Sequence, residues 1–462
     1  MGGARARAAC GTRGGAGAPV TRTEVIKALD DRYLADPLKV RFFPFALAAA
    51  EGNRLVDVEG RGYLDFTAGW AVANLGYGNP RVREAVVQQF DRTSFGTLTA
   101  WMNEPAAHLA RRLVEMMPGD FPKKAWFGLH GSDANDCLAK LVPLATGRRR
   151  IVSFIGGYHG QTAGSAALSG HTAQARSGGA GNVVKIPYPD PYRPLFGDRE
   201  PGQAVLDYLE HYVMRTICPA DDTAAVIVEP MQSDGGDIVP PDGFLEGLQA
   251  LCRRHGILLL IDEVKIGCGR SGHLFAFQHF GLEPDAVSLG KSLGGGMPIS
   301  AVVGRQELLD QGAATNMYTM AGNPVSCAAA LASLDEIEER GLVARAARTG
   351  NLLLARLRSL QDAHPLVGDV RGLGMMLGVE NVRDRHTKEP AARESAKIVY
   401  RAFELGLVVF YGGIYSNVLE ITPPLTLTEA EVEEGVAILD QAIGDVEAGR
   451  VPDERVAEYA GW

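Results

Sequence analysis

The sequence predicts an α/β protein with a large domain, built on a mainly parallel sheet, and a smaller α+β domain. Short apolar segments alternate with helical patterns from about residue 80, which is typical of a parallel sheet covered on both faces. After about residue 336 this alternation stops, and a Pro-Pro break follows at 423–424. The chain has 462 residues, of which 46% are hydrophobic and 22% charged, so it can bury a core of this size.

The expected elements begin with a helix that opens at a capping box, Thr21 with Glu24, and continues to about Tyr33. Two short strands around a glycine turn are expected at 55–65. Six apolar segments are predicted as strands of the large sheet: 151–154, 183–186, 225–228, 257–261, 286–289 and 299–303. The remaining expected elements are helices at 244–254, 324–341 and from 429, and strands at 370–380 and 407–410.

These elements predict a domain order along the chain. We expect a disordered tail at 1–22, because this Gly-, Ala- and Arg-rich segment has almost nothing to bury. The first part of the small domain is expected at 23–75, the large domain at 76–335, and the rest of the small domain at 336–462.

Composition excludes several classes of partner. The net charge of −9 does not favour nucleic acid, and no run of about 18 apolar residues could span a membrane. The six cysteines are too widely spaced for a zinc site or a disulfide framework, so we expect reduced thiols and no bound metal. The N-terminal segment lacks the apolar region of a secretory signal. A cytoplasmic location and a small-molecule substrate are expected.

One glycine pattern resembles a dinucleotide-binding motif. Residues 267–272 fit G-x-G-x-x-G after an apolar strand. A dinucleotide site needs these glycines directly at the strand end, opening a helix, whereas Asp262, Glu263 and Lys265 intervene here. The spacing therefore does not favour a dehydrogenase.

Four other features are expected at the carboxyl edge of the sheet, where open α/β proteins bind ligands. Asp262 and Lys291 each follow a predicted strand, and Tyr158 follows a third. Residues 131–135 begin a helix whose free N–H groups suit a phosphate. A lysine, a buried carboxylate, an aromatic ring and a phosphate cradle together are what pyridoxal phosphate requires.

These segments resemble the class III aminotransferase family of fold-type I pyridoxal-phosphate enzymes over about residues 25–445. The resemblance implies a seven-stranded large sheet and is carried by six motifs: Ser288-Leu289-Gly290-Lys291, Asp262-Glu263-Val264, Gly131-Ser132-Asp133-Ala134-Asn135, Tyr158-His159-Gly160, Glu229-Pro230 and Thr319-Met320-Ala321-Gly322-Asn323-Pro324.

The resemblance also implies a role for individual residues. Lys291 would bond the cofactor, Asp262 would pair with its pyridine nitrogen, and Thr319 would reach the phosphate of a neighbouring subunit. This last role implies a homodimer with shared active sites. The remaining implied cofactor contacts are the phosphate-binding Gly131 and Ser132, the ring-stacking Tyr158 and Val264, and Glu229.

Two residues depart from the family pattern. Glu420 stands where the family usually has an Arg that grips the substrate α-carboxylate. A carboxylate there predicts a substrate without a free carboxylate, such as an amide, a lactam or an amine, unless Glu420 points elsewhere and another Arg serves. Lys265 stands where the family usually has Gln. It could act as an acid or base if its pKa is lowered, or simply donate a hydrogen bond in place of Gln.

Both departures resemble the α-amino-ε-caprolactam racemases, a group of amino-lactam and amino-acid-amide racemases with this fold. In that group Asp234 and Lys265 would lie beside the substrate and Trp70 would line its pocket, although a core Trp and an Asp-Gly-Gly turn would look the same in sequence. The predicted function is racemisation, with Lys291 removing the α-proton. Tyr158, assisted by Lys265 or Asp234, would supply a proton on the opposite face.

Two alternatives stay open. The first is an ω-amine or diamine aminotransferase in which Glu420 binds a distal ammonium. The second is a catalytically inactive protein that uses the fold for binding or regulation, although the presence of both Lys291 and Asp262 argues against it.

Overall fold

The structure, a computed structural model, describes residues 20–175 and 181–459. Residues 1–19 of the expected disordered tail lie outside this range. Its last residue, Arg22, instead begins helix α1 (Arg22–Tyr33). The expected capping box is present, because the Thr21 side chain accepts a hydrogen bond from the Glu24 backbone N–H and Glu24 accepts one from the Thr21 N–H.

The large sheet has seven strands in the order β4-β10-β9-β8-β7-β5-β6. Neighbours from β9 to β6 are parallel, whereas β10 runs antiparallel to both β9 and β4, which confirms a mainly parallel sheet. The strands are β4 (Lys123–Gly128), β5 (Arg150–Phe154), β6 (Val183–Ile186), β7 (Thr223–Val228), β8 (Leu258–Asp262), β9 (Ala286–Leu289) and β10 (Ser300–Arg305).

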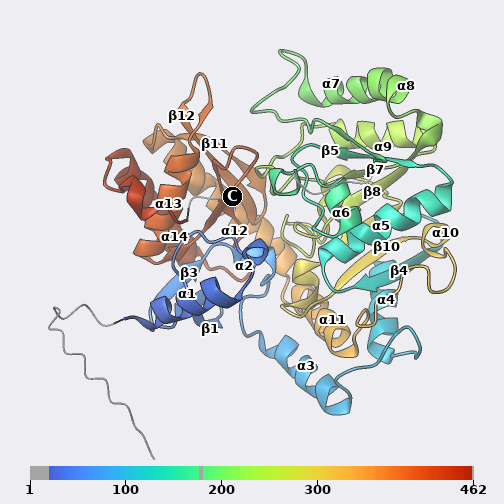
Figure 1. Cartoon of the computed structure of the whole chain (residues 1–462), viewed down its shortest axis with the longest axis horizontal. Coiled ribbons are helices and arrows are strands. Elements are labelled where there is room, and N and C mark those ends of the chain that lie inside the picture. The colour runs from blue at the N-terminus through green and yellow to red at the C-terminus, as the bar shows by residue number, and fades with distance from the viewer. Residues whose placement is uncertain (1–19, 176–180, 460–462) are drawn as a thin grey trace, which may run out of the picture.

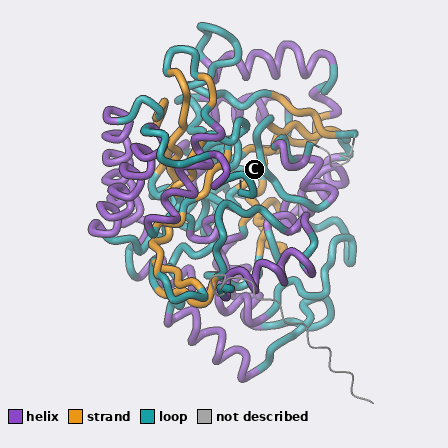
Figure 2. Tube along the Cα trace, turned by 60° about the vertical axis from the view of Figure 1, so that its left-hand side comes forward, coloured by secondary structure: helices purple, strands orange, loops and turns teal. Residues whose placement is uncertain are grey.

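Both faces of this sheet are buried. Along β7, Ala225 and Ile227 belong to one buried apolar cluster, while Val226 and Val228 belong to another on the opposite face. The sheet is surrounded by helices (Figures 1 and 2). They are α3 (Pro80–Arg92), α4 (Glu104–Glu115), α5 (Gly131–Thr146), α6 (Ala163–Leu168), α7 (Pro201–Tyr208), α8 (Met214–Thr216), α9 (Phe244–His255), α10 (Gln306–Leu309) and α11 (Pro324–Glu339).

The remaining elements join the two ends of the chain, as the blue and red segments at the left of Figure 1 show. A four-stranded sheet has the order β1-β2-β3-β14, in which β14 from the C-terminal part pairs in parallel with β3. A second sheet has the order β11-β12-β16-β15, with β13 paired to β12. The elements are β1 (Leu47–Glu51), β2 (Arg54–Asp57), β3 (Gly62–Asp65), β11 (Val367–Leu373), β12 (Met376–Asp384), β13 (Glu389–Pro390), β14 (Leu407–Val408), β15 (Phe410–Gly412) and β16 (Val418–Ile421), with helices α2 (Ala68–Ala71), α12 (Leu342–Ala363), α13 (Ala392–Leu405) and α14 (Glu429–Glu447).

The glycine-rich segment 267–272 forms turns and does not open a helix. Within it, the fully buried Arg270 donates hydrogen bonds to the carbonyls of Met375 and Pro423 and to the Asn74 side chain. The segment therefore ties the large sheet's loops to the C-terminal part of the chain. In the described ranges, no helix is long and apolar enough to cross a membrane.

Candidate active site

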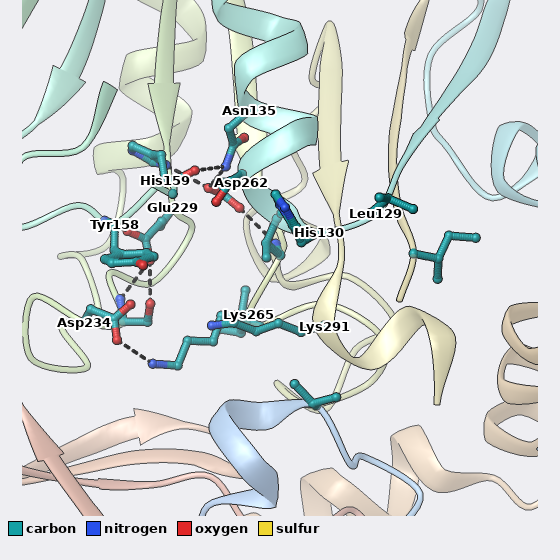
Figure 3. Close-up of a pocket in the computed structure, with 18 of the residues that line it drawn as sticks. Leu129, His130, Asn135, Tyr158, His159, Glu229, Asp234, Asp262, Lys265 and Lys291 are labelled. Carbon is teal, nitrogen blue, oxygen red and sulfur yellow. Dashed lines mark hydrogen bonds and ion pairs between the residues drawn. The ribbon is translucent and has the colours of Figure 1, made fainter. Parts of the chain in front are cut away.

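A cavity of about 530 Å³ lies at the carboxyl ends of the parallel strands, where the sequence places the candidate residues. Its walls come from the loops after β5, β7 and β8, the first turn of α5, and the segment after β9 (Figure 3). The predicted site residues that line it are Gly131, Ser132, Tyr158, Glu229, Asp234, Asp262, Val264, Lys265 and Lys291.

Asp262, the last residue of β8, is a buried carboxylate held by three donors. Its Oδ2 lies 2.7 Å from His159 Nδ1 and 2.7 Å from Asn135 Nδ2, and its Oδ1 accepts the Val264 backbone N–H at 2.9 Å. Burial alone would lower the pKa of His159, but the hydrogen bond and charge of Asp262, together with the charge of Glu229, raise it. This arrangement fixes a negative charge at the floor of the cavity, as a pyridine nitrogen requires (Figure 3).

The first turn of α5 forms a close-fitting cradle. A Cβ atom on Gly131 would lie 2.4 Å from Val264 Cγ1, so only glycine fits there. A Cβ atom on Gly160 would lie 2.5 Å from Ser132 Oγ. The first N–H groups of a helix have no partner within the helix and attract anions. These residues fit a phosphate group.

Lys291 follows β9 and adopts φ +42°, a left-handed conformation that is strained for a lysine. Its side chain is half-buried and lines the cavity. Burial, and then the neighbouring charge of Lys265, lower its pKa to about 8. An amine that can lose its proton near neutral pH suits both covalent bonding to a carbonyl group and proton transfer.

Lys265 lies between two carboxylates. Its Nζ is 2.8 Å from Asp234 Oδ1 and 2.7 Å from Glu420 Oε2, and all three side chains are buried. Burial alone would lower the pKa of Lys265, but the two carboxylates outweigh burial and raise it. Lys265 was expected to act as an acid or base only if its pKa were lowered. Its pKa is raised instead, so this condition is not met. Lys265 remains a cation.

Glu420 and Trp70 support Lys265 from outside the cavity. Neither is among the described residues that line it. Glu420 lies on β16, and the Trp70 ring centroid is 5.3 Å from Lys265 Nζ, within reach of a cation–π contact. Glu420 thus points towards the site, yet Lys265 stands between it and the cavity.

Tyr158 and Asp234 lie together on one side of the cavity, and the Lys291 side chain enters from the other (Figure 3). Burial raises the pKa of the Tyr158 phenol. Burial would also raise the pKa of Asp234, but Lys265 and then Lys291 outweigh it and lower that pKa. The site therefore holds a protonated phenol beside an ionised carboxylate.

Glu229 fixes the loops around Tyr158. Its Oε1 accepts the Tyr158 backbone N–H at 3.0 Å, and its Oε2 accepts the Ser233 N–H at 2.9 Å and hydroxyl at 2.7 Å. Thr319 is exposed and lies outside the described lining of the cavity. Its reach to a neighbouring subunit stays a prediction.

Two residues of the Asp262 network had no assigned role in the sequence-based prediction. His159 follows Tyr158 in the loop after β5, and Asn135 lies one turn into α5 after Gly131. The only signal in the sequence is position, since a polar residue next to a strand end at the ligand-binding edge can reach the other strand ends.

The comparisons with known proteins agree with this site. The family described as aminotransferase class III matches residues 37–443. The leucine/methionine racemase of Thermococcus litoralis is 40% identical over 446 residues, which cover 96% of this chain and all of that protein. The 5-aminovalerate aminotransferase DavT of Pseudomonas aeruginosa is 38% identical over 407 residues, 87% of this chain and 94% of that one.

The fold has solved counterparts. The omega transaminase of Pseudomonas jessenii in complex with PMP is 32% identical, has a TM-score of 0.83, and matches over 88% of this chain and 93% of that one. The cofactor of this site is pyridoxal phosphate. The Asp262 carboxylate, the Gly131 cradle and the Lys291 amine with its lowered pKa fit it.

Proposed function

Because this chain belongs to the class III aminotransferase family, we propose that it is a racemase that acts on α-amino lactams or α-amino-acid amides. A racemase must remove a proton from one face of a carbon atom and return one to the other face. The observation that carries the proposal is the placement of Lys291 on one side of the cavity and of Tyr158 with Asp234 on the other (Figure 3).

Each of these side chains suits one part of the reaction. Bound pyridoxal phosphate supplies an electron sink for a carbon atom that loses its proton. The Lys291 amine, with a pKa of about 8, accepts that proton at its Nζ. The Tyr158 hydroxyl donates a proton from the opposite side; burial and the charge of Asp234 raise its pKa, and the charge of Lys265 opposes them. Lys265 itself holds Asp234 in place.

The charge of the cavity supports a substrate without a free carboxylate. Among the described residues that line it there is no arginine. Asp234, Lys265 and Glu420 together carry a net charge of −1, since two carboxylates share one ammonium. An amide or lactam carbonyl can accept a hydrogen bond without opposing this charge.

A second candidate substrate is a neutral amino acid. One relative is a leucine/methionine racemase. The ammonium of Lys265 lines the cavity and could meet a carboxylate, and the apolar residues Val72, Met231 and Met297 suit an aliphatic side chain. This candidate retains the racemase mechanism and changes only the recognised group.

A second candidate reaction is transamination, because another relative is an aminotransferase. Racemisation needs no second substrate, whereas transamination needs a keto acid. The test is incubation of the holoenzyme without keto acid, separately with one enantiomer of an amino lactam, of an amino-acid amide and of the matching free acid. We expect the lactam or amide to lose optical purity fastest. Fastest racemisation of the free acid would favour the second substrate, and turnover only with keto acid would contradict the racemase.

We also propose that the enzyme is a homodimer with shared active sites. Leu98, Met102 and Met317 are exposed apolar residues beside a second cavity of about 340 Å³, which suits burial against another copy. Thr319 follows Met317, one of these exposed residues, two positions later in the chain. Sedimentation should detect a dimer in the active enzyme, and Thr319→Ala should weaken cofactor binding. A fully active monomer would contradict this proposal.

A further inference from the structure

Asp237 lies near the buried charged cluster of Lys265, Asp234 and Glu420 and takes no part in the proposed reaction. It follows β7 in a loop, is 1% exposed, and adopts φ +51°, a left-handed conformation that is uncommon for aspartate. In the pairing of β12 with β16, Gly378 stands directly opposite Glu420. A Cβ atom on Gly378 would lie 2.8 Å from Asp237 Cβ and 3.3 Å from its Oδ2. The missing side chain of Gly378 thus leaves room for Asp237 beside Glu420.

Both carboxyl groups have one buried oxygen without a hydrogen-bond partner. These atoms are Oδ1 of Asp237 and Oε1 of Glu420. Two buried acceptors cannot satisfy each other while both carboxyl groups are ionised, and leaving each one unpaired is unfavourable. A single proton placed between them would turn one group into a donor and satisfy both atoms.

We propose that Asp237 carries this proton and donates it in a hydrogen bond to Glu420, so that Asp237 is a positioning residue acting through Glu420 on Lys265. With Asp237 neutral, the cluster of Asp234, Lys265, Glu420 and Asp237 keeps a net charge of −1. With Asp237 ionised, the charge would be −2, held by a single ammonium.

The charges around Asp237 agree with a bound proton. Burial, and then Glu420, raise the pKa of Asp237, and Asp234 acts in the same direction. Lys265 and Arg371 oppose them, but Lys265 already contacts two carboxylates. Arg371 is likewise engaged, with Asp369 and Glu380 at 2.8 Å each.

The proton on Asp237 sets the net charge of the cluster of Asp234, Lys265, Glu420 and Asp237 beside the cavity. The proton on Asp237 does not depend on the proposed racemase function, whereas its effect on substrate recognition does. A cluster at −1 holds Lys265 towards Asp234 and the cavity. A second unneutralised carboxylate would draw Lys265 further towards Glu420 and away from Asp234.

The test compares unfolding of the wild-type holoenzyme with Asp237→Asn by denaturant titration between pH 5 and 7. Above the ordinary aspartate pKa of about 3.9, the wild type must take up a proton when it folds, and asparagine needs none. The ratio of the two unfolding constants should therefore shift about tenfold per pH unit in favour of the variant. Asp221→Asn, the same substitution at an exposed site, measures the background slope. A ratio that does not change with pH would overturn the proposal.

Two further measurements separate a shared proton from burial alone, and the second, made in Glu420→Gln, holds even if Asp237→Asn does not fold. Infrared difference spectra should show a protonated carboxyl group at neutral pH that Asp237→Asn removes. In Glu420→Gln, which retains Asp237, this band should titrate at lower pH than in the wild type, because the largest neighbouring charge is gone. An unchanged titration in Glu420→Gln would show that Glu420 does not share the proton and would overturn the proposal.

Discussion

The ammonium of Lys265 lies 2.7 Å from the carboxylate of Glu420, although the two residues are 155 positions apart in the chain. Lys265 follows β8 of the large sheet, and Glu420 lies on β16 of the C-terminal sheet. The sequence departs from the expected family pattern at these two positions, where Gln is usual in place of Lys265 and Arg in place of Glu420. The two departures are therefore in direct contact, with a cation after β8 and an anion on β16.

The pairing predicts how Glu420→Arg will behave. Alone, this substitution places a guanidinium beside the buried Lys265 ammonium. Two like charges 4 Å apart repel by about 4 kcal/mol at an effective dielectric of about 20, so we expect a clear loss of stability. Adding Lys265→Gln should recover much of the lost stability, since the double variant has the Gln and Arg that the family usually carries at these two positions. Urea unfolding of the single and double variants, with Glu420→Gln as the neutral control, measures the coupling.

The same double variant tests substrate recognition. It carries an arginine and lacks both charges of the original pair, so it should gain kcat/KM for a free amino acid relative to the matching amide. A ratio of kcat/KM values unchanged from the wild type would show that Glu420 and Lys265 do not decide this preference.

The strand pattern was largely predictable because buried parallel strands are continuous apolar runs. Strand β4 was not predicted, since it begins with Lys123 and Lys124 and lies at the sheet edge. The expected strand at 407–410 is divided between two sheets, because β14 pairs with β3 and β15 with β16. Pairing partners depend on the tertiary fold, which the local pattern does not contain.

The cofactor-binding residues could be placed at one edge from strand ends alone, as Asp262 and Lys291 show. The direction in which the pKa of Lys265 shifts could not be predicted from the sequence. An isolated buried lysine has a lowered pKa, and only the fold reveals that two carboxylates surround it. Likewise, Glu420 was expected to face the substrate, whereas the structure places it behind Lys265.

Lys291 should be the residue that bonds the cofactor. Its amine has a lowered pKa and loses its proton more readily than an ordinary lysine, whereas Lys265 is held charged by two carboxylates. Borohydride reduction of the holoenzyme followed by peptide mapping should place the cofactor on Lys291. Lys291→Ala should abolish the label. A label on Lys265 would reverse the assignment.

Tyr158→Phe should separate the two proton transfers. The ring is retained but the hydroxyl on the side opposite Lys291 is lost (Figure 3). Loss of a general acid typically costs 10²–10⁴-fold, so racemisation should fall by about that range. Exchange of the α-proton of one enantiomer, catalysed by Lys291, should persist. Equal losses of exchange and racemisation would argue against Tyr158 as the donor.

His364 should make stability depend on pH. Its Nδ1 lies 2.8 Å from Glu447 and its Nε2 2.9 Å from Asp440. Burial alone would lower its pKa, but the hydrogen bonds and negative charges of Glu447 and Asp440 together raise it. The stabilisation is thus complete below the unfolded pKa of about 6.5 and is lost as the pH rises through the higher folded pKa.

Comparison of the wild type with His364→Gln tests this effect. The difference in unfolding free energy should be on the order of 1 kcal/mol at pH 6, because Asp440 is exposed and screened by solvent. It should shrink at alkaline pH. A difference that stays constant with pH would show that His364 contributes only by packing.

A racemase must transfer protons at both faces of one carbon atom. The direct measurement is to incubate the holoenzyme in deuterated water with one enantiomer of an amino lactam, without keto acid, and to follow chirality and α-deuteration together. We predict that the opposite enantiomer appears carrying deuterium at the α-carbon, with no keto product. Formation of a keto product and the aminated cofactor, with no opposite enantiomer, would contradict the proposed racemase function.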